Sequence, residues 1–199
     1  MILYCATTNG GKLREFRKAA EIAACEVEVA PGLNEIVPPD ETGATFEANA
    51  ILKAEYYGAH VAGYLFCDDS GLEVDALAGS PGVHSARYAG GAGDAANNAL
   101  LLANLKGIEN RTARFVSVIA LVKDGRLVRT FRGTVEGEIS QGESGPHGFG
   151  YDPLFYYPPF GCTFGEADLS RKSNVSHRAI ALKRLFEYLR KGHSSSIAP

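Results

Sequence analysis

Short apolar runs alternate with segments of helical periodicity over residues 1–67, and this alternation restricts the chain to an α/β architecture. Residues 1–6 form a continuous apolar run typical of a buried strand, and residues 64–67 form a similar run. Residues 26–30 are also expected to form a strand. Between them, residues 13–23 and 45–62 carry apolar side chains at helical spacing. This part of the sequence therefore predicts strands that are joined by helices.

The later part of the chain adds an antiparallel element. Residues 115–122 and 127–139 flank an Asp-Gly pair, which indicates a hairpin between two β-rich runs. A glycine-rich loop is expected over residues 79–93, and Asp94 is expected to cap a helix that reaches about Leu105. The last helix is expected from about His177 to Arg190, followed by a frayed tail over residues 192–199. Together these features predict an α/β fold with a mixed central sheet.

Charge and composition exclude several classes of function. The chain has 20 Lys and Arg against 23 Asp and Glu, so its net charge of −3 argues against a nucleic-acid partner. No apolar run approaches the length of a membrane span, and no secretory signal opens the chain. The spacing of the four cysteines, Cys5, Cys25, Cys67 and Cys162, matches no zinc or redox motif. We therefore expect buried free thiols and a cytoplasmic location.

The turn at residues 7–12 lies between the first predicted strand and a helix N-terminus. Free backbone N–H groups and the helix dipole favour an anion at such a turn, and glycine lets the backbone approach a ligand closely. Lys12 opposes the helix dipole, which a bound phosphate would explain. A plain turn with a solvated lysine explains the same residues equally well.

A second candidate segment surrounds the start of the helix near Thr45, which is a candidate N-cap. Asn49 and Lys53 are four residues apart and therefore share one helix face. A carboxylate ahead of the helix, Asp40 or Glu41, could bind a metal while Lys53 reaches the same anion. Acidic residues that merely complement the helix dipole are the alternative.

Asp68 and Asp69 directly follow the third predicted strand and lead into Ser70 and Gly71. Two carboxylates at the end of a buried strand are costly unless they are solvated, paired or bound to a cation. Neighbours on a strand point to opposite faces, so only one of the two acids faces a given site unless the chain bends. Carboxylate oxygens favour Mg²⁺ with a substrate phosphate as a further ligand, and function is favoured here over a capped turn.

Two later segments suit the recognition of a flat ring. Phe149 lies between two glycines, where a ring that stacks on a base is as plausible as a wedge in a turn. Asp152 could accept a hydrogen bond from a ring N–H. Ser176 is a natural N-cap, which places His177 and Arg178 in a first helical turn, where cations again oppose the dipole. A solvated basic run is the alternative interpretation.

Taken together, these segments resemble the inosine triphosphate pyrophosphatase family, also called the Ham1 family. The resemblance runs from Ala6 to about Leu189, and its motifs stand in the family's order. They are Thr7-x-Asn9-x-x-Lys12, Glu41-Thr42-Gly43-x-Thr45-Phe46, Asn49-Ala50-x-x-Lys53-Ala54, Asp68-Asp69-Ser70-Gly71-Leu72, Pro81-Gly82-x-x-Ser85-Ala86-Arg87-Tyr88, Gly148-Phe149-Gly150-Tyr151-Asp152-Pro153 and Ser176-His177-Arg178.

The resemblance implies an elongated mixed sheet with two lobes and a nucleotide cleft, a single such domain over residues 1–199, and a homodimer. It implies Mg²⁺-dependent hydrolysis of ITP, dITP, XTP and dXTP to the monophosphate and pyrophosphate, which clears these nucleotides from the pool. Glu41 and Asp69 would hold the metal, and Asp69, with Asp68 beside it, would activate the water. The implied substrate-binding residues are Thr7, Thr8, Asn9, Gly10, Gly11, Lys12, Lys53, Ser70, Phe149, Gly150, Tyr151, Asp152, Lys172, His177 and Arg178.

Within that set, Lys12, Lys53 and Lys172 would hold the triphosphate, Phe149 would stack on the purine, and Arg178 would donate to its 6-oxo group. Adenine presents an amino donor at that position and would be left mispaired. Two alternatives remain: another nucleotide phosphohydrolase that releases orthophosphate, and a nucleotide-binding regulator without catalysis. The carboxylates at Glu41, Asp68 and Asp69 count against the regulator.

Overall fold

The computed structural model describes residues 2–194 and is built around one sheet. Its strands are β1 (Ile2–Cys5), β2 (Glu26–Val29), β3 (Tyr64–Val74), β4 (Thr112–Lys123), β5 (Arg126–Ile139), β6 (Phe155–Tyr157) and β7 (Cys162–Thr163). They lie in the order β2-β1-β3-β4-β5-β6-β7. β1 pairs in parallel with β2 and β3, and every later pair is antiparallel. The predicted α/β fold with a mixed central sheet is therefore confirmed.

Most of the α-helices, but not all, begin at a residue whose side chain caps the helix. The α-helices are α1 (Gly10–Ile22), α2 (Phe46–Gly58), α3 (Asp94–Asn104), α4 (Leu169–Lys172) and α5 (His177–Ser194). Thr45 accepts from the Ala48 N–H at the start of α2, as predicted. The prediction that Asp94 caps α3 is wrong. Gly93 holds the cap position without a side-chain bond, and the Asp94 carboxylate accepts from the Gly150 N–H instead.

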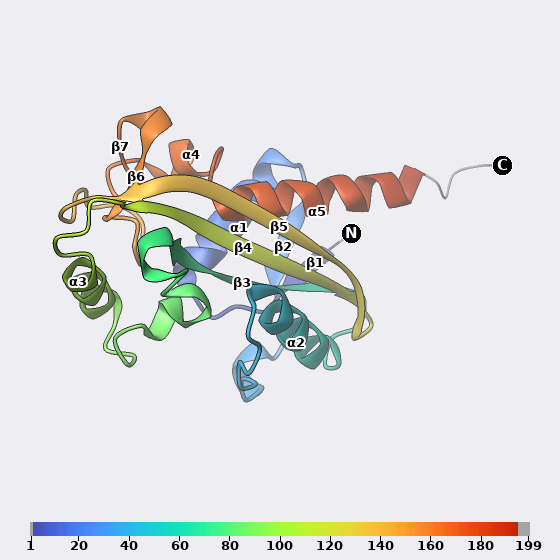
Figure 1. Ribbon diagram of the computed structural model, residues 1–199. Coiled ribbons are helices and arrows are strands. Elements are labelled where there is room, and N and C mark those ends of the chain that lie inside the picture. The colour runs from blue at the N-terminus through green and yellow to red at the C-terminus, as the bar shows by residue number, and fades with distance from the viewer. Residues whose placement is uncertain (1, 195–199) are drawn as a thin grey trace.

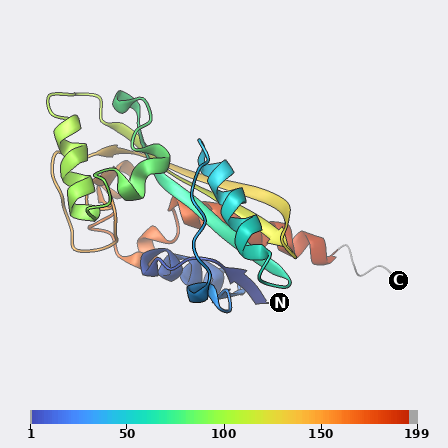
Figure 2. The same ribbon diagram turned by 90° about the horizontal axis from the view of Figure 1, so that it is seen from below.

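The helices cover both faces of the sheet (Figure 1). α1 and α5 pack on one face, where Phe16 of α1 meets Phe66 of β3 at a ring-centroid distance of 5.2 Å. α2 lies on the other face, where Ala50 and Ala54 are fully buried against β3 and β4 (Figure 2). A third apolar cluster closes the far end of the sheet beneath α3 and includes Phe155 of β6. These layers leave the middle of β3 between two helical faces.

β3 is longer than the sequence predicts. Its apolar run was expected to end at Cys67, but all eleven residues of β3 pair with β4, because that long antiparallel partner provides a paired residue as far as Ala113, opposite Val74. The placement of Asp68 at a strand end is therefore wrong for β3 itself. Asp68 does lie just beyond the end of the neighbouring strand, because β1 ends at Cys5, opposite Phe66. The β1 side of β3 therefore has no strand partner from Cys67 onward.

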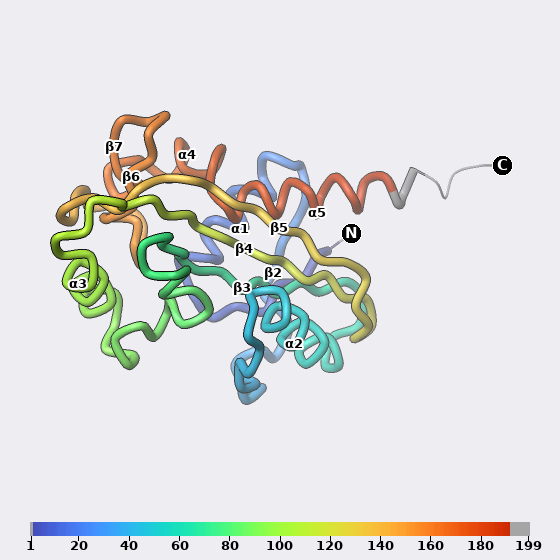
Figure 3. The backbone as a smooth tube through the Cα atoms, viewed as in Figure 1, coloured from blue at the N-terminus to red at the C-terminus, as the bar shows by residue number. Residues whose placement is uncertain are grey.

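The chain between β3 and α3 is more ordered than the long loop predicted there. A 3₁₀-helix, η2 (Asp75–Leu77), follows β3, and a second, η3 (Gly82–Arg87), lies within the glycine-rich segment (Figure 3). Two more are η1 (Leu33–Glu35) and η4 (Pro158–Phe160). The predicted hairpin is confirmed: Asp124 and Gly125 both have positive φ, as a two-residue turn of this type needs.

The C-terminal prediction is partly overturned. α5 extends to Ser194, so residues 192–194 are helical, while residues 195–199 of the predicted tail lie outside the described residues. Within residues 2–194, no helix is both long and apolar enough to cross a membrane. All four cysteines are free, but Cys25 and Cys162 are only partly buried.

Candidate active site

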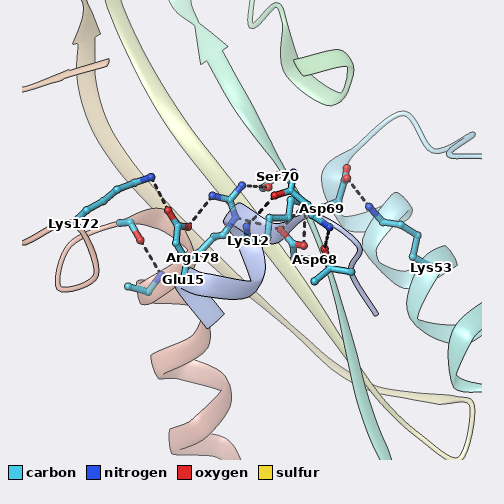
Figure 4. A network of polar contacts seen from close by, with 12 residues as sticks. Lys12, Glu15, Lys53, Asp68, Asp69, Ser70, Lys172 and Arg178 are labelled. Atoms are coloured by element: carbon cyan, nitrogen blue, oxygen red, sulfur yellow. Dashed lines mark hydrogen bonds and ion pairs between the residues drawn. The ribbon is translucent and has the colours of Figure 1, made fainter. Parts of the chain in front are cut away.

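Asp68 and Asp69 stand at the centre of a row of charged contacts that crosses β3 (Figure 4). Successive side chains on a strand alternate between faces, and the two acids do so here. Asp68 contacts Lys12 from α1, whereas Asp69 contacts Lys53 from α2. Both acids are buried, with 4% and 6% of their surface exposed. The extended mid-strand backbone thus gives the two carboxylates different partners.

On the α2 face, two side chains, Lys53 and Asn49, fix Asp69. The Lys53 ammonium lies 2.8 Å from Asp69 Oδ1 and 2.6 Å from Glu41 Oε1. Asn49 donates to Asp69 Oδ2 at 3.3 Å, and its own Oδ1 accepts from the Gly43 N–H at 2.7 Å. The predicted shared face of Asn49 and Lys53 is therefore confirmed, and Asn49 ties the loop that carries Glu41 to Asp69.

The surroundings push the pKa values of the two aspartates apart. Burial alone would raise the pKa of Asp68, but Lys12, Arg178 and Lys53 together lower it to about 2. Burial dominates at Asp69 and raises its pKa above the usual value, although Lys53 acts in the opposite direction. Asp68 is thus held as an ion partner for cations, while Asp69 is the stronger base.

On the α1 face, Lys12 and Arg178 meet at Asp68. The start of α1 positions Lys12, because the Asn9 side chain accepts a hydrogen bond from the Lys12 backbone N–H at 3.0 Å. The Lys12 ammonium in turn donates to Asp68 at 2.9 Å. Arg178 Nε lies 3.5 Å from Asp68 Oδ2, and its Nη2 donates to the Ser70 hydroxyl at 2.8 Å. Three elements, α1, β3 and α5, therefore converge on one buried carboxylate.

Glu15 is a site residue that the sequence analysis missed. Its carboxylate is 5% exposed and bridges two buried cations, Lys172 at 2.6 Å and Arg178 at 2.9 Å. Its spacing of three residues from Lys12 places both on one face of α1, and this is the only local pattern that could have identified it. Lys172 also contacts Asp152 at 2.6 Å. Lys172 therefore belongs to this buried network and is not among the residues that line the cavity described below.

Phe149 lies against the start of α1. A Cβ at Gly11 would come within 2.6 Å of the Phe149 ring, so the packing of this ring requires a glycine here. Lys172 Nζ and Arg178 Cζ each lie 5.1 Å from the ring centroid. The Asp152 carboxylate accepts from the Phe149 N–H at 2.9 Å and so holds the turn that presents the ring.

Two predicted substrate-binding residues are buried away from open space. Tyr151 is 4% exposed, and its hydroxyl donates to the Ser85 carbonyl at 2.9 Å. His177 is 1% exposed and stacks on Phe115 at 4.8 Å. Burial, with Arg178 as the next cause, lowers the pKa of His177 well below 6.5, so its ring is neutral. These two side chains support the site from within the core.

A cavity of about 670 Å³ opens beside the buried network. It gathers one part of the predicted residues, namely Thr7, Thr8, Asn9, Lys12, Glu41, Lys53 and Asp68. Arg87 also lines it, although the sequence analysis gave this residue no role. Phe149 and Arg178 do not line it. The predicted residues therefore divide between an open cavity, whose lining carries both cations and carboxylates, and a buried polar network.

Glu41 and Asp69 could share a cation. Both carboxylates contact the Lys53 ammonium, which shows that one positive charge can reach both. Two carboxylates with substrate phosphate oxygens form a ligand set typical of Mg²⁺. Asp40 lines the same cavity but is exposed, and Glu41 is the acid that contacts Lys53. Among residues 2–194 no cluster of three or more acidic, histidine or cysteine side chains could hold a metal, so phosphate oxygens would have to complete the shell.

Known proteins with similar sequences and structures point to one family. A model of the Ham1 family matches residues 3–188. The dITP/XTP pyrophosphatase of Acidobacterium capsulatum is 46% identical over 95% of this chain and 98% of its own length, and that of Exiguobacterium sp. is 48% identical over 93% and 95%. The solved structure of the Staphylococcus aureus Ham1 protein superimposes with a TM-score of 0.85 at 39% identity, covering 96% of this chain and 100% of that one.

Proposed function

The chain belongs to the Ham1 family, and on that premise we propose that it hydrolyses ITP, dITP, XTP and dXTP to the nucleoside monophosphate and pyrophosphate. The observation that carries the proposal is the division of the site into an open cavity lined by Lys12 and Lys53 and a buried donor-rich network, with Asp68 and Asp69 between them. This arrangement suits a ligand with a polyphosphate at one end and a flat polar ring at the other.

The phosphate chain is assigned to the cavity. Lys12 and Lys53 supply two ammonium groups there, and the N-terminus of α1 adds backbone N–H groups and the positive end of its dipole. Glu41 and Asp69 are assigned to Mg²⁺, which when bound neutralises phosphate charge and stabilises the leaving pyrophosphate. The contact of both acids with one ammonium supports this assignment.

Asp69 is assigned to the water that attacks the α-phosphorus. Asp69 contacts one cation, Lys53, whereas Asp68 is engaged by both Lys12 and Arg178. Asp69 is therefore better placed than Asp68 to accept a proton from water. Asn49 and Lys53 hold the two oxygens of Asp69 in place, so the orientation of the base needs no rearrangement. Asp68 instead keeps Lys12 and Arg178 charged and positioned.

The buried network is assigned to the base. Lys172 pairs with Glu15 and Asp152, and Arg178 pairs with Glu15. The N–H groups of these cations that the carboxylates do not use can donate hydrogen bonds to a bound base. A 6-oxo purine supplies the acceptor that they need, whereas the 6-amino group of adenine would leave a buried donor unpaired. Phe149 borders this position and is assigned to stacking on the purine.

A panel of nucleoside triphosphates, assayed with and without Mg²⁺ and with identified products, tests the proposal. We expect ITP and XTP to yield monophosphate and pyrophosphate only when Mg²⁺ is present. Orthophosphate as the product would favour the alternative phosphohydrolase, and binding without turnover would favour the regulator. Asp69→Asn should lower kcat by at least 100-fold, while Asp75→Asn, a control in η2 beyond the end of β3 that pairs with Arg114, should not. Near-normal turnover by Asp69→Asn would refute the assigned role.

The cellular setting follows from the same premise. We propose a cytoplasmic homodimer that acts on free nucleotides and needs neither a nucleic acid nor a membrane partner. The net charge of −3 supports the absence of a nucleic-acid partner. Sedimentation of the purified chain at several concentrations tests the dimer, and a constant monomer mass would refute it.

A further inference from the structure

Arg87 lies at the end of η3, a short helix docked on the open edge of β3. The Ser85 hydroxyl of this helix accepts from the Leu72 N–H at 2.9 Å and donates to the Gly82 carbonyl at 2.6 Å. Gly71 makes the approach possible, because a side chain there would come within 2.3 Å of the Ser85 hydroxyl oxygen. η3 therefore takes the edge position that β1 leaves free, beside the two aspartates.

Distant side chains fix this short helix. Asn97 of α3 is 2% exposed, and its amide donates to the carbonyls of Ser85 and Ala86 while accepting from the Ala89 N–H at 2.8 Å. The Tyr151 hydroxyl adds a second contact to the Ser85 carbonyl. A 3₁₀-helix of six residues with a single buried side chain would not hold its position alone. The contacts from α3 and Tyr151 thus determine where Arg87 stands.

The Arg87 guanidinium reaches the wall of the cavity. Its Nη1 lies 3.2 Å from Glu41 Oε2. Lys53 contacts the other oxygen of the same carboxylate, Oε1. The side chain is 47% exposed, and within residues 2–194 Glu41 is its one protein partner. The order Arg87, Glu41, Lys53, Asp69 places the guanidinium at the end of the row farthest from the assigned base.

We propose that Arg87 binds the β- and γ-phosphates of the substrate, the part that leaves as pyrophosphate. The proposal rests on the proposed function, since the α-phosphate must lie near Asp69 and the rest of the chain must extend along the cavity away from it. A planar guanidinium with unused N–H groups can bind two phosphate oxygens at once. Phosphate then competes with Glu41 for the guanidinium, so the ion pair seen here belongs to the ligand-free chain.

Binding of inorganic pyrophosphate in the presence of Mg²⁺, measured by calorimetry on the full chain, tests this inference. We expect Arg87→Ala to weaken pyrophosphate binding about tenfold or more, and Arg87→Lys to weaken it less, because it keeps the charge but loses the paired donors. IMP binding should stay within about twofold in both variants. His84→Ala is the control, since His84 is exposed on the same helix but does not line the cavity.

Three results would overturn the inference: pyrophosphate binding by Arg87→Ala within twofold of the wild type, equal losses for pyrophosphate and IMP, or no pyrophosphate binding by the wild type. Circular dichroism establishes that the variants are folded. Failure of the proposed function is a separate result, because it would show as the wrong products from ITP with the wild-type chain. Pyrophosphate affinity does not depend on turnover and would still decide the role of Arg87.

Discussion

Glu15 offers the most direct test of the buried network. The change Glu15→Gln keeps the size of the side chain and one carbonyl acceptor but removes the charge. Lys172 and Arg178, which are 2% and 6% exposed, then lose the carboxylate that lies 2.6 and 2.9 Å from them. Breaking a buried ion pair from one side costs about 3–5 kcal/mol. We expect a loss near 3 kcal/mol, because the amide oxygen retains one hydrogen bond.

The pH dependence identifies the charge as the cause. Burial alone would raise the pKa of Glu15, but Arg178 and Lys172 outweigh it and lower the pKa below its usual value. An acid with a lowered pKa in the folded state stabilises the fold above its unfolded pKa, about 4.3. That contribution is lost as the pH falls through the folded-state pKa. The difference in stability between wild type and Glu15→Gln should therefore be full at pH 7 and shrink below about pH 4.

Urea unfolding followed by far-UV circular dichroism measures the effect, since the chain has no tryptophan. Glu21→Gln is the matched control on the same helix. Its partner Lys18 lies 3.0 Å away, but both side chains are exposed, so this change should cost less than about 0.5 kcal/mol. A Glu15→Gln variant as stable as this control at pH 7 would show that the network does not hold α1 to α5.

Two further predictions concern the α1 turn and the core. Gly11→Ala should raise the KM for ITP several-fold by displacing the Phe149 ring. The control Gly10→Ala, whose new methyl group would meet only Arg14 at 3.7 Å, should leave the KM within about twofold of the wild-type value. Equal effects of the two changes in steady-state kinetics would contradict this prediction. The pKa of buried His177 is well below 6.5, so below about pH 6.5 the unfolded chain binds a proton at this residue that the folded chain does not bind. The free energy of unfolding should therefore fall by up to about 1.4 kcal/mol per pH unit below about pH 6.5. His177→Gln should flatten that slope in urea unfolding between pH 5 and 7, and the same change at exposed His84 should not.

Local patterns in the sequence determined the elements that carry the site. The spacing of Asn49 and Lys53 predicted that both would act from one helix face, and both contact Asp69. The capping role of Thr45 and the turn at Asp124 and Gly125 followed from residue chemistry within four positions. Such features are encoded between near neighbours, so a single chain is enough to identify them.

Only the tertiary structure decided which of these residues meet. β3 continues through Asp68 because it pairs with a strand about fifty residues later, and no local pattern carries that information. Glu15 pairs with Arg178, 163 positions away, and the packing of the Phe149 ring requires a glycine at position 11. The position of Arg87 likewise depends on Asn97. Contacts of this kind arise when separate segments pack together, and periodicity along the chain cannot specify them.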